Sequence, residues 1–136
     1  MRKLRVMLGT NDGKEIFLGH PGDSDVFYIY ELREDGSYEK LREIKNEAKD
    51  MEEEHHHGGT GKMKKVLRMI GNVDVILTRR NSPNLIRIAQ STEIQPIIVT
   101  VDSIEEGLKK LHEKFDEIYD MVERRKSGER FEVKKI

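Results

Sequence analysis

The sequence predicts a single α/β domain in which a mixed β-sheet carries helices on its faces. The first third of the chain holds short apolar, aromatic and β-branched runs separated by Asp-Gly turns, a pattern typical of antiparallel strands. The later half alternates helix-spaced apolar residues with two short apolar runs, which indicates a parallel β-α-β unit with a right-handed crossover. A chain of 136 residues is long enough to bury one core without disulfides.

The strands of the first third are separated by clear turn signals. Asp12-Gly13 is a hairpin signal between the first two of them. If those two strands form a hairpin, the glycine-rich loops at Gly9 and Gly19 lie at its opposite ends. The strands expected in this part of the chain span residues 4–8, 15–18, 26–32 and 38–44.

The later half alternates predicted helices and strands. Ser82 is a good N-cap and Pro83 suits the first position of the middle helix. Apolar strands are expected at 73–78 and 94–101 on either side of this helix. An earlier helix is indicated by the spacing of Met63, Val66, Leu67 and Ile70.

A single long helix is expected to complete the domain. Asp102 or Ser103 can cap it. We place the domain at residues 1–124 and a C-terminal tail, extended or frayed, at 125–136. The buried stripe of this helix is predicted to comprise Leu108, Leu111, Phe115, Ile118 and Val122.

Composition excludes several classes of protein. The absence of cysteine excludes disulfide scaffolds and thiolate-held zinc or iron–sulfur centres. The 25 basic and 26 acidic residues nearly balance, which gives no overall attraction to nucleic acid. No apolar run is long enough for a membrane helix, which needs roughly 20 residues, and the start of the chain lacks the apolar region of a signal peptide. We therefore expect a cytoplasmic protein without a membrane span. Charged residues make up 38% of the chain and Asn and Gln are few, a thermophile-like composition.

The strongest candidate site is the histidine- and glycine-rich loop before the first predicted helix. Imidazole is a good ligand for iron, nickel, copper and zinc, and glycines let the backbone approach a ligand closely. In an extended chain His55 and His57 share a side, so these two are the predicted metal ligands. Lys62 and the positive end of the helix favour an anion. The predicted cofactor-binding residues are His55, His56, His57, Gly58, Gly59 and Gly61, with His20 as a further candidate.

Other interpretations of these residues compete with a binding site. Three histidines in a polar loop can simply be solvated, and so can His20. The P-loop motif fails because His56 and Met63 occupy two of its required positions. A two-metal nuclease would need several carboxylates to converge, but turn and cap positions explain most of the Asp residues. The chain has no Gly-x-Ser-x-Gly elbow and no cysteine nucleophile, so we predict that it is not an enzyme.

The ordered set of motifs resembles the dinitrogenase iron–molybdenum cofactor-binding family over roughly residues 3 to 112. The resemblance is carried by the turn at residues 11–13, the loop at 19–22, the strand at 26–32 with Asn46 after it, the loop at 55–61 and the run at 73–76. It implies a ribonuclease H-like motif with a five-stranded mixed sheet, three antiparallel strands followed by two parallel ones. It also implies binding of an iron–molybdenum or related metal–sulfur cluster without catalysis.

The sequence departs from the family where Arg79 and Arg80 replace a glycine-rich turn before Pro83. The resemblance and the histidine- and glycine-rich loop together make the leading hypothesis a carrier of an anionic metal cluster, which works with cofactor-assembly proteins as a monomer or homodimer. One alternative is a metal-dependent hydrolase on the ribonuclease H-like frame. Another is an interaction module that dimerises through the last helix, in which Leu108, Leu111, Phe115 and Ile118 face a partner.

Overall fold

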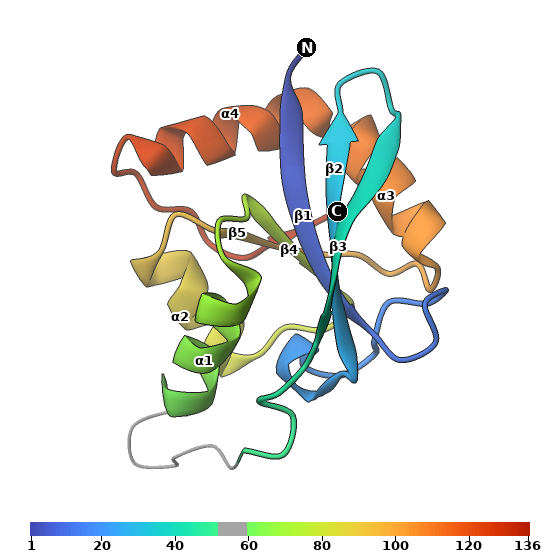
Figure 1. Cartoon of the computed structure of the whole chain (residues 1–136). Helices are drawn as coiled ribbons and strands as arrows, with labels where there is room; N and C mark the ends of the chain where they lie inside the picture. Colours follow the sequence, from blue (N-terminus) through green and yellow to red (C-terminus); the bar gives the residue numbers. More distant parts are fainter. Residues whose placement is uncertain (52–59) are drawn as a thin grey trace.

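The computed structural model of the chain describes residues 1–51 and 60–136. In these two ranges a single sheet is flanked by four α-helices and one short 3-10 turn (Figure 1). The elements are β1 (Lys3–Thr10), η1 (Pro21–Asp23), β2 (Val26–Arg33), β3 (Tyr38–Lys45), α1 (Thr60–Ile70), β4 (Val75–Thr78), α2 (Pro83–Ser91), β5 (Gln95–Ile98), α3 (Ile104–Glu113), α4 (Phe115–Lys126) and β6 (Lys134–Lys135).

The sheet is mixed, as the sequence predicts, and its strand order is β3-β2-β1-β4-β5-β6. β1, β2 and β3 pair antiparallel, whereas β4 pairs parallel with β1, and β5 and β6 continue in parallel. The expected number of five strands is wrong. The sixth is β6, which forms because residues of the expected tail add backbone pairing to the edge of β5: Ile136 N–H donates to Ile98 O at 2.9 Å.

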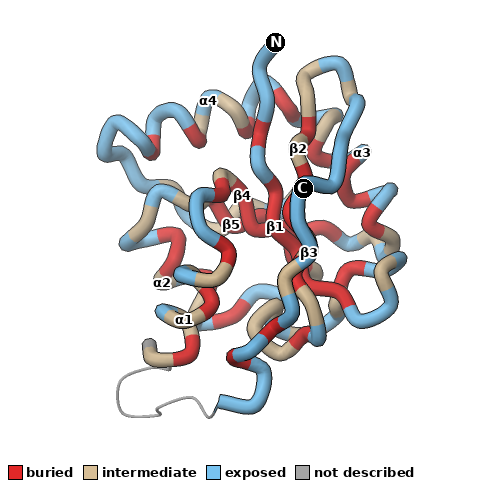
Figure 2. Tube along the Cα trace, in the orientation of Figure 1, coloured by how far each residue is buried: buried red, intermediate tan, exposed pale blue. Residues whose placement is uncertain are grey.

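Two apolar layers sandwich the sheet, and the buried residues concentrate on its central strands (Figure 2). Alternating side chains of one strand enter different layers: Val6 and Leu8 point to one side of β1 and Met7 to the other. The first layer packs under α3 and α4, and it includes the whole predicted stripe of Leu108, Leu111, Phe115, Ile118 and Val122. The second layer packs under α1 and α2.

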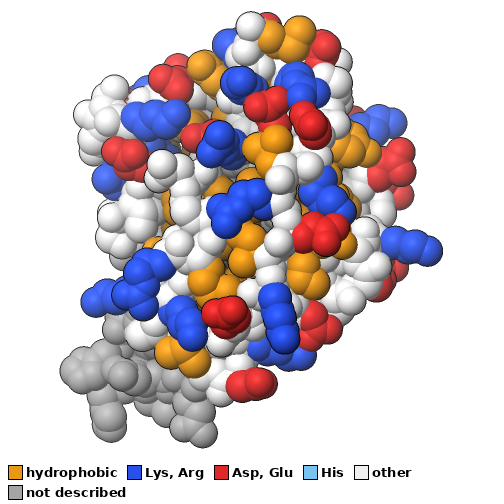
Figure 3. Space-filling view, in the orientation of Figure 1, with side chains coloured by type: hydrophobic (Ala, Val, Ile, Leu, Met, Phe, Trp, Pro, Cys, Tyr) orange, Lys and Arg blue, Asp and Glu red, His pale blue; other side chains and the backbone are white. Residues whose placement is uncertain are grey.

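The β1–β3 hairpins carry charge where they face solvent. Charged side chains of both signs are interspersed on the side of the molecule shown in Figure 3. Glu31 forms ion pairs with Lys3 and Arg33 at 3.5 and 2.8 Å, and Arg33 also reaches Glu39. The edge strand β3 itself carries Glu39, Lys40, Arg42 and Glu43, and charged side chains on an edge disfavour pairing with other strands.

The predicted strand at 15–18 is wrong, and so is the hairpin that it would form with β1. This segment makes one isolated bridge, from Glu15 to Ser103. Ile16 is 1% exposed and its N–H donates to Asp102 O at 2.9 Å, so the apolar character of the segment reflects burial of a loop. The loops at Gly9 and Gly19 are therefore not at opposite ends of a hairpin, because the loop returns across the end of β1: Phe17 N–H donates to Gly9 O at 2.8 Å.

The single long helix expected after residue 103 is two helices. Ser103 is the N-cap of α3, with its hydroxyl accepting from Glu106 N–H at 3.0 Å. The helix breaks at Lys114, whose φ of −111° and ψ of 19° are not helical, and α4 starts one residue later. Apolar residues of both helices nevertheless belong to the same layer on one face of the sheet.

Arg125 joins the C-terminal residues to the rest of the domain. Its side chain is fully buried, and the guanidinium donates to carbonyl oxygens at the end of α2, with distances of 2.7 Å to Ala89 O and 2.6 Å to Thr92 O. It also donates to Gln95 Oε1 and Phe131 O. Burial lowers the pKa of Arg125 to about 10, so the group stays charged at neutral pH.

Candidate functional site

A pocket lies on the α1/α2 face of the sheet, at the carboxyl ends of β1 and β4. It encloses about 50 Å³, which is room for roughly one or two water molecules. Its lining is mostly apolar and comes from β1, β4, α1 and α2: Met7, Met63, Val66, Leu67, Ile76, Leu85 and Ile88. The region outside the carboxyl ends of parallel strands is where open α/β sheets usually bind ligands.

Polar residues complete the lining, and they come from three different segments. His20 and Lys62 lie on η1 and α1, whereas Ser82 and Asn84 lie at the start of α2. His20 is exposed, while Lys62 and Ser82 are buried. His20 is therefore the most solvent-exposed of these four lining residues.

The η1 turn holds His20 beside the end of β1. Its backbone is closed by hydrogen bonds from Asp23 N–H to His20 O at 2.9 Å and from Ser24 N–H to Pro21 O at 3.1 Å. The turn sits directly on Gly9: a Cβ at that position would lie 2.4 Å from Ser24 Oγ. A glycine is needed there because any side chain would push η1, and with it the wall of the pocket, away from the sheet.

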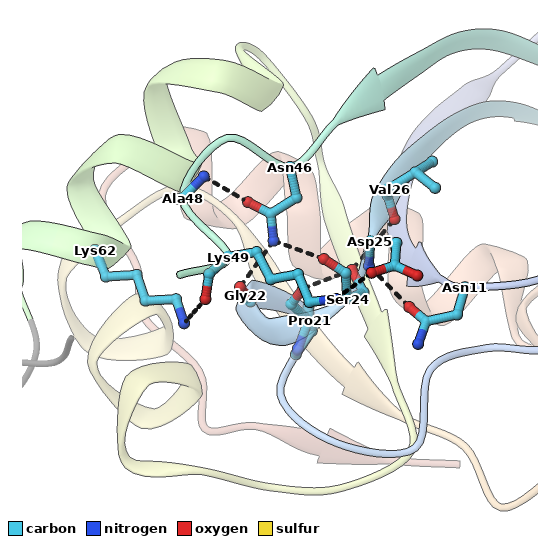
Figure 4. A network of polar contacts seen from close by, with 10 residues as sticks. All are labelled: Asn11, Pro21, Gly22, Ser24, Asp25, Val26, Asn46, Ala48, Lys49 and Lys62. Atoms are coloured by element: carbon cyan, nitrogen blue, oxygen red, sulfur yellow. Dashed lines mark hydrogen bonds and ion pairs between the residues drawn. The ribbon is translucent and has the colours of Figure 1, made fainter. Parts of the chain in front are cut away.

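A polar network fixes η1 from the other side (Figure 4). Its centre is the buried Asn46, which follows β3 and whose Nδ2 donates to Gly22 O and Ser24 O, both at 2.8 Å. The Oδ1 of Asn46 accepts from Ala48 N–H at 2.9 Å. All the hydrogen-bonding atoms of this amide thus hold the η1 loop against the chain that leaves β3.

Lys62 connects the same loop to α1. Its ammonium forms an ion pair with the Asp23 carboxylate and donates to Lys49 O at 3.2 Å (Figure 4 shows the second contact). Only 6% of the Lys62 side chain is exposed, against 46% for Asp23. The sequence interpretation of Lys62 as an unpaired positive charge for a ligand is therefore corrected: in the structure its charge is already paired.

The start of α2 forms the opposite wall. Ser82 is its N-cap, as predicted, and the Ser82 hydroxyl accepts from Leu85 N–H at 3.2 Å. Pro83 occupies the first helical turn, where a missing N–H costs nothing. Asn84 Oδ1 accepts from Arg87 at 3.1 Å. Ser82 and Asn84 were not predicted as pocket residues, since the cap signal gives a helix start but not what lies opposite it.

The predicted site residues have different outcomes. His20 lines the pocket, and Gly61 lies in the first turn of α1, next to the pocket residue Lys62. In the described ranges, 1–51 and 60–136, no group of three or more His, Asp or Glu side chains is placed to hold a metal ion. The remaining predicted residues, His55, His56, His57, Gly58 and Gly59, lie outside the described part of the chain.

Arg79, in the loop between β4 and α2, has a structural role. Its guanidinium pairs with Asp102 and donates to Ile16 O at 3.3 Å, so it ties the loop after β1 to the segment before α3. Its side chain is 17% exposed. Arg80, by contrast, is exposed to solvent.

Fold and pocket together define a small α/β domain with a mixed sheet and a pocket between two helix starts at the carboxyl edge of the parallel strands. The chain belongs to the dinitrogenase iron–molybdenum cofactor family, whose profile matches residues 2–114. A search of curated proteins and a search of solved structures returned no match. None of the helices described is long and apolar enough to cross a membrane.

Proposed function

We propose that this protein binds and carries an anionic iron–molybdenum or related metal–sulfur cluster during cofactor assembly, and that it does not catalyse a reaction. The observation that carries the proposal is the position of His20 at the pocket between α1 and α2, in a chain that belongs to a cofactor family. The histidine segment immediately precedes α1 in the sequence. His55, His56, His57, Gly58, Gly59 and Gly61 are the proposed partners of His20, with His55 and His57 as metal ligands.

The chemistry of the pocket fits such a cargo at its entrance. A volume of about 50 Å³ is too small for a cluster of several metal and sulfur atoms, so the cluster would rest beside His20 and contact the apolar lining from outside. Imidazole nitrogen and methionine thioether are suitable donors for iron and for softer metals, and the lining includes the partly exposed Met63. Apolar surroundings also shield a sulfide cluster from water.

We further propose that the domain has a ribonuclease H-like motif. The support is the strand order β3-β2-β1-β4-β5, with three antiparallel strands followed by parallel ones. The proposed partners are the metal cluster and cofactor-assembly proteins in the cytoplasm, with no role for nucleic acid or a membrane.

Two alternatives have less support. Dimerisation through the last helix requires a free apolar stripe, but Leu108, Leu111 and Ile118 are fully buried within this chain and Phe115 is 4% exposed. A metal-dependent hydrolase requires convergent carboxylates. Asp23, Asp25 and Asp102 each pair with a lysine or arginine instead.

Anaerobic reconstitution with iron, sulfide and molybdate tests the proposal. Bound metal is measured by elemental analysis after desalting. We expect stoichiometric metal on the wild type, a reduced amount on His20→Ala, and almost none when His55, His56 and His57 are all changed to Ala.

His112→Ala is the matched control. This histidine contacts Glu34 O at 2.9 Å, on the α3 side of the sheet, so its removal should leave the metal content unchanged. A wild-type protein that retains no metal, or an equal loss from the control, would contradict the carrier function.

A further inference from the structure

The buried ion pair between Lys62 and Asp23 has a geometry that packing alone does not require. Lysine is rarely buried, because its ammonium loses hydration, and a neutral chain of similar size would fill the same space at lower cost. Its partner is a half-exposed carboxylate, which returns only part of that loss. A charge kept in such a place gives a defined geometry to the segments that it joins.

Those segments are the two sides of the pocket that flank the exposed imidazole. Lys62 belongs to the first turn of α1, and Asp23 is the last residue of η1, three positions after His20. The stem of Lys62 lies against Gly22, where an added Cβ would be 3.6 Å from Lys62 Cε. The third contact, to Lys49 O, joins the chain that leaves β3.

We propose that Lys62 is a positioning residue of the pocket: through Asp23 it fixes the η1 turn, and therefore His20, against the start of α1. Asn46 supports the same turn from the side of β3, but it does not reach α1. Lys62 joins the start of α1 directly to η1 and so bears on the separation between His20 and the helix start. The link to cargo binding rests on the proposed function, whereas the effect on η1 does not.

Amide hydrogen exchange in the cargo-free protein tests the effect on η1. The amides of Asp23 and Ser24 close the turn, so their exchange rates report its opening. In Lys62→Met we expect these two rates to rise about tenfold, because a hydrogen bond to a charged group contributes at least that factor. Amides of the β1–β2 ladder should change much less. Lys64→Met, an exposed position on the same helix, is the control.

Two further variants keep the test decisive if Lys62→Met is poorly folded. Asp23→Asn removes the other half of the ion pair from a half-exposed position and should open the same two amides. Lys62→Arg keeps the charge and should restore most of the protection. Unchanged exchange at Asp23 and Ser24, or an equal increase throughout the sheet, would overturn the proposal.

The affinity for tetrathiomolybdate, a coloured metal–sulfur dianion, tests the consequence for binding. We expect Lys62→Met to weaken binding about tenfold when His20 is present. In a protein that already carries His20→Ala the same substitution should have little effect, because Lys62 acts through His20. An equal loss in both backgrounds would instead indicate direct contact of Lys62 with the anion and would refute positioning. Opened η1 amides in a protein that binds no tetrathiomolybdate would support the positioning of η1 while contradicting the carrier function.

Discussion

We expect the substitution Arg125→Leu to lower the stability of the folded protein strongly. The substitution removes a fully buried guanidinium that donates hydrogen bonds to the end of α2, to β5 and to the segment before β6. Leucine fills much of the same volume with apolar atoms, so the change tests the hydrogen bonds and the charge more than the packing.

The magnitude follows from the acceptors that lose their donor. Ile88 O keeps bonds from Thr92 N–H and Thr92 Oγ1, so it stays satisfied. The other four acceptors, at Ala89, Thr92, Gln95 and Phe131, lose the guanidinium, at roughly 1 kcal/mol or more each. Relief of the buried charge offsets part of this, which leaves a net loss of about 3 kcal/mol. For a chain of this length that corresponds to a fall in Tm of about 10 °C.

Thermal and urea unfolding, followed by circular dichroism, measure this loss. Arg124→Leu is the control, because its side chain is 49% exposed and its ion pair with Glu129 lies at the surface, so we expect a much smaller shift. Arg125→Lys keeps a charge but loses the planar fork and should fall between the two. A leucine variant as stable as the wild type would show that burying the charge costs as much as its hydrogen bonds return.

Two other predictions concern a close contact and pH. Gly107→Ala would place a Cβ 2.7 Å from Ile16 Cδ1 and 3.1 Å from Leu77 Cδ2, so we expect overpacking to outweigh the gain in helix propensity and to lower Tm by several degrees. An unchanged Tm would show that Ile16 can retract. Hydrogen bonds from the N–H groups of Glu15 and Lys14 lower the pKa of Asp12 below its ordinary value of 3.8. The contribution of the Asp12 carboxylate to the free energy of unfolding is therefore present above pH 3.8 and is lost as the pH falls through the lowered pKa. Urea unfolding at pH 6 and pH 3 should therefore show a smaller acid loss for Asp12→Ala than for the wild type.

Local signals in the sequence identified most elements correctly. Ser82 caps its helix as predicted, and of the two predicted candidates Asp102 and Ser103 it is Ser103 that caps α3, because capping depends on residues only three positions apart. The predicted strand at 15–18 is wrong because a short apolar run shows which side chains are buried, and a loop can bury Ile16 as well as a strand can. The break at Lys114 had no proline or glycine to mark it, and the apolar stripe continues across it.

The site was less predictable, because it depends on contacts between distant residues. His20 was identified as a candidate from its glycine-rich loop. Its neighbours across the pocket were not, since Lys62 and Asp23 are 39 positions apart and Asn46 reaches Gly22 over 24. A single sequence contains no local pattern for such pairs. The segment of imidazole and glycine before the start of α1 stays a prediction of the sequence.

The family match ends close to the end of α3, whereas the folded core continues beyond it. The family profile stops at residue 114, one position before α4 begins, so α4 and β6 lie outside the region shared with the family. Yet Ile118 and Val122 belong to the same core as Leu4 and Val6, and Arg125 binds the end of α2. A protein cut at residue 114 would retain all of its recognisable ancestry and lose part of its cooperative folding unit. In this chain the segment that is shared with the family is therefore shorter than the segment that is needed for a stable fold.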